Sequence, residues 1–108
     1  MKIAITSTGT TLSSTIDPRF GRAAYYVIYD IEKKSFEISP NPIKNVSDGA
    51  GPAAVEFVAE KGVEKIVSGE FGIKIKDLLD SLKIQMITVK DHSKTIQDII
   101  DMLNNQLK

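Results

Sequence analysis

The stretch EKIVSGEFGIKIKDLLDSLKIQMITV, residues 64–89, decides the fold of this chain. Its first apolar run, which a Ser-Gly pair ends, predicts a brief strand over 64–69. The segment 73–82 carries apolar residues at i, i+3, i+4 and i+7, which predicts an amphipathic helix. The run at 84–89 predicts another strand. Because strand, helix and strand follow one another closely, the chain needs a right-handed crossover and a parallel pair of strands.

The residues that precede this unit predict three further strands. An apolar run at 2–6 ends in a loop rich in Ser, Thr and Gly, and aromatic and β-branched runs follow at 24–31 and 35–39. The last two runs are separated by three polar residues, which is typical of a hairpin. Pro40 and Pro42 then end the sheet, because proline cannot donate a backbone hydrogen bond.

Two more helices complete the pattern. Residues 51–62 predict a helix with Pro52 at its first position, where proline is favoured. Residues 93–107 repeat the helical spacing, and Thr95 with Asp98 resembles a capping box. The element order is therefore βββαβαβα, in one domain over residues 1–108 with a mixed five-stranded α/β sheet.

Composition narrows the classes of function. The 108 residues suit a single core, and 14 basic residues balance 14 acidic ones, so nothing favours nucleic acid or an anionic membrane as a partner. The chain has no cysteine, which excludes disulfides, thiolate-held clusters and a cysteine nucleophile. The N-terminal apolar run is too short for a signal peptide, and we expect a cytoplasmic protein.

Both arginines of the chain lie in the stretch DPRFGR, residues 17–22. Arginine presents a planar fork of donors that suits carboxylate, phosphate and other oxyanions, and lysine does not replace it at such a site. Arg19 and Arg22 are therefore candidate contacts for an anion.

A structural interpretation of the same stretch competes with this one. Phe20 would anchor the loop to the core, Gly21 would form a turn, and the arginines would pair with carboxylates such as Asp17. Surface pairs of that kind contribute only about 0–1 kcal/mol, which is a weak reason to select arginine twice. We therefore prefer the binding interpretation.

Other loops are expected to share an edge of the sheet with this stretch. The segments 6–11, 68–72 and 89–93 follow three of the predicted strands, and ligands of open α/β sheets collect beyond the carboxyl ends of parallel strands. Backbone N–H groups of glycine loops beside helix starts can face an anion. For any single glycine we prefer a tight turn or a cap as the explanation, and only the clustering of the glycines favours a site. The candidate binding residues in these loops and before the first helix are Ser7, Thr8, Gly49, Gly51, Gly69 and Gly72. With Phe20 and Gly21, which lie between the two arginines, and with Arg19 and Arg22 themselves, they make up the candidate binding site.

His92 is the one histidine of the chain and a weak candidate metal ligand, with Asp91 beside it. A firm metal site needs three or four convergent ligands, which the sequence does not assemble. Catalytic motifs are missing as well. The first strand has no acidic residue for nuclease metals, and no P-loop, dinucleotide-binding or Gly-x-Ser-x-Gly string occurs. We expect a protein that is not an enzyme.

The segments MKIAIT (1–6), DPRFGRAAYYVIYD (17–30) and DGAGPAAVEFVAEKGVEKIVSGEFGIKIKDLLDSLKIQMITV (48–89) carry a family resemblance. They contain Phe-Gly-Arg followed by Ala, Gly-x-Gly before the first helix and Gly-x-x-Gly before the second. In this order they resemble the dinitrogenase iron-molybdenum cofactor biosynthesis family, the NifX/NifB-type domain, over nearly the whole chain. The resemblance implies a ribonuclease H-like fold with strand order 3-2-1-4-5 and an antiparallel second strand.

The resemblance also implies binding of a metal cluster. Members in the nitrogenase pathway carry an iron-sulfur or iron-molybdenum cluster between a donor and an acceptor protein, and many have a histidine where this chain has Arg19. A guanidinium cannot ligate a metal but can hold an anionic cluster, its precursor or another small anion by charge-assisted hydrogen bonds. We expect no such cofactor to survive aerobic purification. The alternative is a protein-interaction or regulatory domain without a metal cofactor, and the oligomeric state stays open.

Overall fold

The computed structural model describes residues 1–106 and contains a five-stranded sheet in the order β3-β2-β1-β4-β5. Strand β2 runs antiparallel to β1 and β3, whereas β4 is parallel to β1 and β5 is parallel to β4. This arrangement confirms the predicted strand order and the antiparallel second strand. The strands are β1 (Lys2–Ser7), β2 (Tyr25–Asp30), β3 (Ser35–Pro40), β4 (Val63–Ser68) and β5 (Gln85–Thr88).

The helices follow the predicted order, with differences at their ends. They are α1 (Ala50–Glu60), the 3-10 turn η1 (Ile73–Ile75), α2 (Lys76–Ser81) and α3 (Ile96–Gln106). Pro52 is the third residue of α1 rather than its first, because the left-handed Gly49 (φ 73°) already turns the chain into the helix. The predicted second helix is a 3-10 turn followed by a short α-helix, and Leu107 of the predicted third helix lies outside the described residues.

The capping box at the start of α3 is confirmed. The Thr95 N–H donates to Asp98 Oδ2 at 3.0 Å, and the Asp98 N–H donates to Thr95 Oγ1 at 3.1 Å. The hydrogen bond from the Thr95 backbone lowers the pKa of the Asp98 carboxyl. Two N–H groups at the helix start, which have no intrahelical partner, thereby each donate to a side-chain oxygen.

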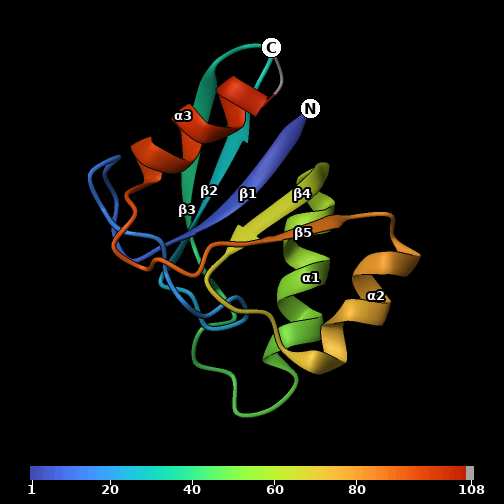
Figure 1. Cartoon of the computed structure of the whole chain (residues 1–108). Coiled ribbons are helices and arrows are strands. Elements are labelled where there is room, and N and C mark those ends of the chain that lie inside the picture. The colour runs from blue at the N-terminus through green and yellow to red at the C-terminus, as the bar shows by residue number, and fades with distance from the viewer. Residues whose placement is uncertain (107–108) are drawn as a thin grey trace.

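Helices cover both faces of the sheet, with α1 and α2 on one side and α3 on the other (Figure 1). Alternate residues of β1 point to opposite faces: Ala4 packs in the cluster under α1 and α2, whereas Ile3 and Ile5 pack in the cluster under α3. All three are fully buried. Burial on both faces explains why the central strands β1 and β2 are nearly continuous apolar runs rather than alternating ones.

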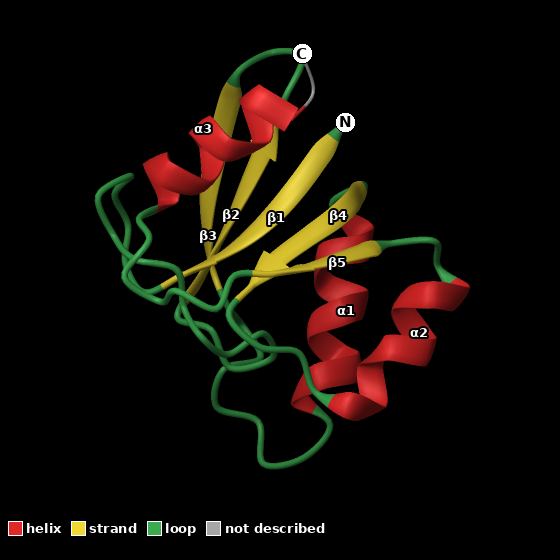
Figure 2. Cartoon of the chain, viewed as in Figure 1, coloured by secondary structure: helices red, strands yellow, loops and turns green. Residues whose placement is uncertain are grey.

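The long loops gather at the carboxyl ends of β1, β4 and β5 (Figure 2). Backbone hydrogen bonds join them there, from Asp17 N to Thr6 O at 3.0 Å, from Gly69 N to Asp17 O at 3.3 Å and from Val89 N to Ser68 O at 2.9 Å. The expected shared edge is therefore present. Within residues 1–106, no helix has the length and apolar character that crossing a bilayer requires.

Candidate functional site

Asp17 organises the DPRFGR loop, whereas the sequence suggested it only as a partner of the arginines. Its side chain is 1% exposed. Its carboxylate accepts hydrogen bonds from the Arg19 N–H at 2.9 Å and from the Ala24 N–H at 3.1 Å, and Thr6 Oγ1 donates to its backbone oxygen at 2.7 Å. One buried carboxylate thus binds the backbone at Arg19 and at Ala24, which fixes the positions of the residues between them.

Arg19 pairs with the same carboxylate but stays half exposed. Its Nε and Nη2 lie 3.3 Å and 3.4 Å from the two oxygens of Asp17, and 56% of its side chain is accessible to solvent. These separations lie beyond the usual range for charge-assisted bonds, which are shorter than 3 Å. Most of the donor capacity of Arg19 therefore faces outward.

Arg22 has a different environment, which explains its selection over lysine. Its Nη1 donates to the carbonyl oxygens of Lys44 at 3.1 Å and Val46 at 2.7 Å, and its Nη2 lies 3.4 Å from that of Ser47. A guanidinium can donate hydrogen bonds to several carbonyl oxygens at once because it has five N–H donors fixed in one plane. Arg22 accordingly holds the loop that leads to α1.

Phe20 is buried at 3% exposure and belongs to the core under α1 and α2. Its ring lies 5.8 Å from that of Tyr26 and 5.7 Å from that of Phe71, both in tilted arrangements. The Tyr26 hydroxyl donates to the Phe20 carbonyl oxygen at 2.5 Å, and burial together with the charge of Asp17 raises the pKa of Tyr26. Phe20 therefore anchors the loop, as the structural interpretation proposed.

Glycine permits two close approaches around this loop. A Cβ on Gly21 would lie 3.1 Å from the backbone nitrogen of Gly51, so the loop packs directly against the start of α1. A Cβ on Gly69 would lie 2.5 Å from Pro18 Cα and 2.8 Å from His92 Nε2. These glycines bring three loops into contact, a use that needs no ligand.

A pocket of about 300 Å³ lies between the DPRFGR loop, the start of α1 and the loop after β4. Its lining residues, which we call the arginine pocket, are Arg19, Phe20, Gly21, Arg22, Ala50, Gly51, Glu70, Phe71, Gly72 and Ile75. The structure thus brings together six of the residues predicted from the sequence. Ala50, Glu70, Phe71 and Ile75 were not predicted, because their approach depends on the packing of distant segments.

Charge in the arginine pocket is mixed but favours an anion on one side. Helix α1 begins without a side-chain cap and without an acidic residue in its first turn, and its first residues line the pocket. The N-terminus of a helix carries partial positive charge and presents unpaired N–H groups. Arg19 adds a full charge, whereas the exposed Glu70 opposes it.

The other predicted residues lie outside the arginine pocket. Ser7 is buried, and its hydroxyl donates to the Gly9 oxygen at 2.8 Å. Thr8 is exposed, and its Oγ1 lies 3.1 Å from the Thr15 oxygen. Gly49 precedes α1 and lines a separate groove between α1 and α2.

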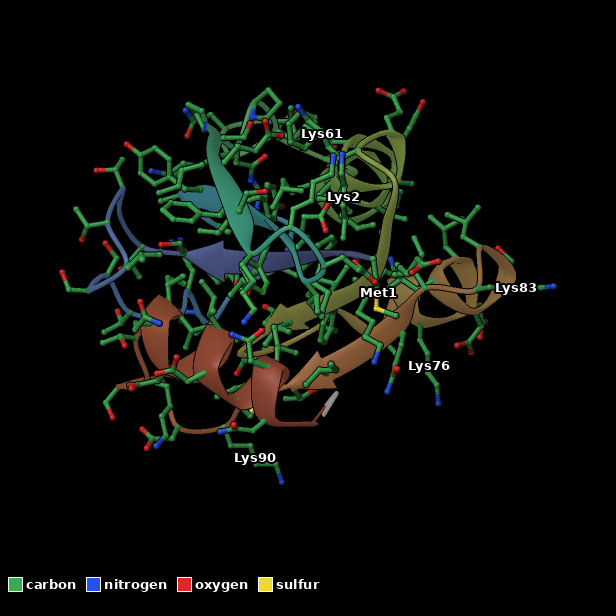
Figure 3. The ribbon with its side chains drawn as sticks, turned by 90° about the horizontal axis from the view of Figure 1, so that it is seen from above. Met1, Lys2, Lys61, Lys76, Lys83 and Lys90 are labelled. Atoms are coloured by element: carbon green, nitrogen blue, oxygen red, sulfur yellow. The ribbon has the colours of Figure 1, made fainter. Side chains whose placement is uncertain are left out.

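His92 is exposed and lines a neighbouring hollow together with Lys90, which projects from the molecule (Figure 3). Asp91 bonds to Ser93 instead of joining His92 as a second ligand. Its Oδ1 accepts from the Ser93 hydroxyl at 2.6 Å and from the Ser93 N–H at 3.0 Å, and these bonds lower its pKa. Across residues 1–106, no group of three or more His, Asp or Glu side chains is placed to hold a metal ion.

Fold and pocket together define a small α/β domain with ribonuclease H-like strand order and a partly cationic pocket at the carboxyl ends of its strands. The chain belongs to the family described as dinitrogenase iron-molybdenum cofactor, whose model matches residues 1–106. This membership confirms the resemblance inferred from the sequence motifs. No curated protein sequence matches the chain significantly.

Solved structures agree with the family. The apo form of the orange protein from Desulfovibrio gigas superposes with a TM-score of 0.89 at 28% identity, over 97% of this chain and 88% of that one. A proposed NifB protein from Thermotoga, assigned to the DUF35 family, gives a TM-score of 0.80 at 32% identity, over 96% and 87%. A proposed dinitrogenase from Methanocaldococcus jannaschii shares the fold, with a TM-score of 0.68 at 16% identity, over 98% and 89%. Family and neighbours indicate a protein of the iron-molybdenum cofactor biosynthesis or carrier type.

Proposed function

We propose that this protein is a carrier, not an enzyme, and that the arginine pocket holds its cargo, an anionic metal cluster or a precursor of one. The observation that carries the proposal is the convergence of the half-exposed Arg19 guanidinium and the uncapped start of α1 on one pocket. Both groups stabilise negative charge, and neither is a metal ligand. The family description supplies the class of cargo.

The side chains of the pocket fit a noncovalent cradle. The chain has no cysteine, and a guanidinium stays protonated, so the pocket contacts an anion through hydrogen bonds and not through coordination. Phe71 and Ile75 supply apolar walls beside Arg19. Arg22 contributes by holding the 44–47 loop through its carbonyl oxygens. A cluster held in this way can pass to an acceptor protein without breaking metal–ligand bonds to the carrier.

The alternative of a protein-interaction domain loses its aromatic anchor at this loop. In that interpretation the loop presents Phe20 and the arginines to a partner, but the Phe20 side chain is 3% exposed and packs against Tyr26 and Phe71. A partner protein therefore has no access to the ring in this conformation. Interaction with a cluster donor or acceptor remains part of the carrier proposal.

Anaerobic titration with isolated iron-molybdenum cofactor, followed by visible absorption, tests the proposal. We expect stoichiometric binding by the wild type and a dissociation constant raised about tenfold or more by Arg19→Gln, since a charge-assisted contact is lost. Arg19→Lys should fall between them. Glu70→Gln should bind at least as tightly as the wild type, because it removes the opposing charge.

Lys90→Gln is the matched control, because it removes a positive charge outside the arginine pocket. Equal weakening by Arg19→Gln and Lys90→Gln would show a general charge effect and contradict the assignment of the pocket. If the wild type binds neither this cofactor nor an isolated iron-sulfur cluster, the carrier proposal fails. Circular dichroism of each variant confirms that the fold is intact.

A further inference from the structure

A groove of about 700 Å³ lies between α1 and α2. Its floor and walls are apolar or small, from Pro52 and Ala53 on α1 to Leu78 on α2. Its charged lining residues are both acidic, Glu56 and Glu60. The groove is distinct from the arginine pocket.

The C-terminal end of α2 supplies features that complement this groove. Leu82 lines it and is 47% exposed, which makes it one of few large apolar side chains left in solvent among the described residues. Lys83 follows directly, and its side chain projects away from the molecule beyond the end of α2 (Figure 3). In the part of the chain that the structure describes, no ion pair involves Lys83, Glu56 or Glu60.

Two non-glycine residues of the described chain have a positive φ, Lys34 in the turn between β2 and β3 and Lys83 after α2. Lys83 has φ 58°, a left-handed conformation that follows the end of α2 and favours glycine. The corresponding position after α1 is Gly62, with φ 79°. A lysine in place of glycine is unfavourable for the isolated fold, and no described contact of its side chain compensates.

We propose that a second copy of this chain occupies the groove, in a two-fold symmetric dimer in which α2 of each copy lies against α1 of the other. In this arrangement Leu82 of one copy enters the apolar groove of its partner, and Lys83 reaches Glu56 or Glu60 across the interface. A two-fold interface requires one face to be self-complementary. The groove offers an apolar hollow with two anions, and the end of α2 offers an apolar projection followed by an outward cation.

Sedimentation velocity over a wide range of protein concentration tests the proposal, which is independent of the cargo. We expect a reversible monomer–dimer equilibrium in the wild type. Leu82→Asp should raise the dimer dissociation constant about tenfold or more, because it places a charge in an apolar contact. Phe36→Asp, at an exposed apolar residue of the edge strand β3, should leave the constant unchanged.

Charge reversal tests whether Lys83 contacts the glutamates of the partner copy or only stabilises its own chain. Lys83→Glu should weaken the dimer, and combining it with Glu56→Lys and Glu60→Lys should restore association. Lys83→Gly should weaken the dimer while the unfolding midpoint of the dilute monomer stays the same or rises, because glycine suits the left-handed backbone.

A wild type that is monomeric at all concentrations would overturn the proposal. A dimer that Phe36→Asp disrupts and Leu82→Asp does not would overturn it as well, and would place the interface at the edge of β3. Failure of the triple charge reversal to restore association would show that Lys83 and the two glutamates do not meet.

Discussion

Replacement of Asp17 by alanine should destabilise the protein by about 2–5 kcal/mol. The change leaves the N–H groups of Arg19 and Ala24 without their acceptor, and an unsatisfied polar group costs about 1–3 kcal/mol depending on its burial. Both bonds lie in part-buried surroundings, at 2.9 Å and 3.1 Å, which sets the lower half of that range for each. The ion pair with Arg19 adds about 0–1 kcal/mol, because the guanidinium is half exposed.

Arg19→Ala is the matched variant, since it removes the ion pair and keeps both backbone contacts of the carboxylate. We expect a loss of about 0–1 kcal/mol for this change. The double variant Asp17→Ala, Arg19→Ala should then be about as unstable as Asp17→Ala alone, with a coupling energy below about 1 kcal/mol.

Urea unfolding followed by circular dichroism measures these differences. With m-values of about 1–3 kcal/mol/M, Asp17→Ala should lower the midpoint by about 1 M or more, whereas Arg19→Ala should shift it only slightly. Equal losses from the two single variants would refute the reasoning. Arg19 would then serve chiefly to neutralise a buried carboxylate, and the proposal that it is available to a cargo anion would lose its basis.

Three further changes follow from single contacts. Gly69→Ala places a Cβ 2.5 Å from Pro18 Cα, and overpacking against backbone should cost about 1–3 kcal/mol in urea unfolding. Tyr26→Phe removes a buried hydroxyl that donates to a backbone carbonyl at 2.5 Å, and should cost about 0.5–1.5 kcal/mol in the same assay. The folded pKa of Asp98 lies below its ordinary value of 3.8 because of the hydrogen bond from Thr95. The ionised carboxylate therefore stabilises the folded protein above pH 3.8, and this stabilisation is lost as the pH falls through the folded pKa. Asp98→Asn should therefore be less stable than the wild type at pH 7, and the difference between their unfolding midpoints should disappear in acid; a difference that persists there would contradict the capping role.

The sheet and its helices were predictable because their signals are local. Residues 64–89 contain strand, helix and strand in periodic form, and a crossover between parallel strands follows from that order alone. The capping pair Thr95 and Asp98 was predictable for the same reason, since its two members are three residues apart. Element ends were less predictable. Helix α1 begins at Ala50, two residues before Pro52, because the left-handed Gly49 already turns the chain into the helix.

The candidate site was only partly predictable. The pairing of Arg19 with Asp17 spans two residues and was weighed from the sequence, but the division of roles between the two arginines was not. Arg22 finds its acceptors 22 to 25 residues later in the chain, at the carbonyls of Lys44, Val46 and Ser47. Every residue has a backbone carbonyl, so the sequence does not show which ones accept a hydrogen bond from Arg22.

The sequence by itself determined the fold class, the order of the elements and the short segment that holds both arginines. It did so because hydrophobic periodicity and turn residues act over a few neighbours along the chain. Only the tertiary structure decided that Arg19 faces a pocket while Arg22 binds a loop, and that Glu70 and Phe71 join them. Those outcomes depend on which distant backbones approach within hydrogen-bonding distance, and packing of the whole core sets that distance.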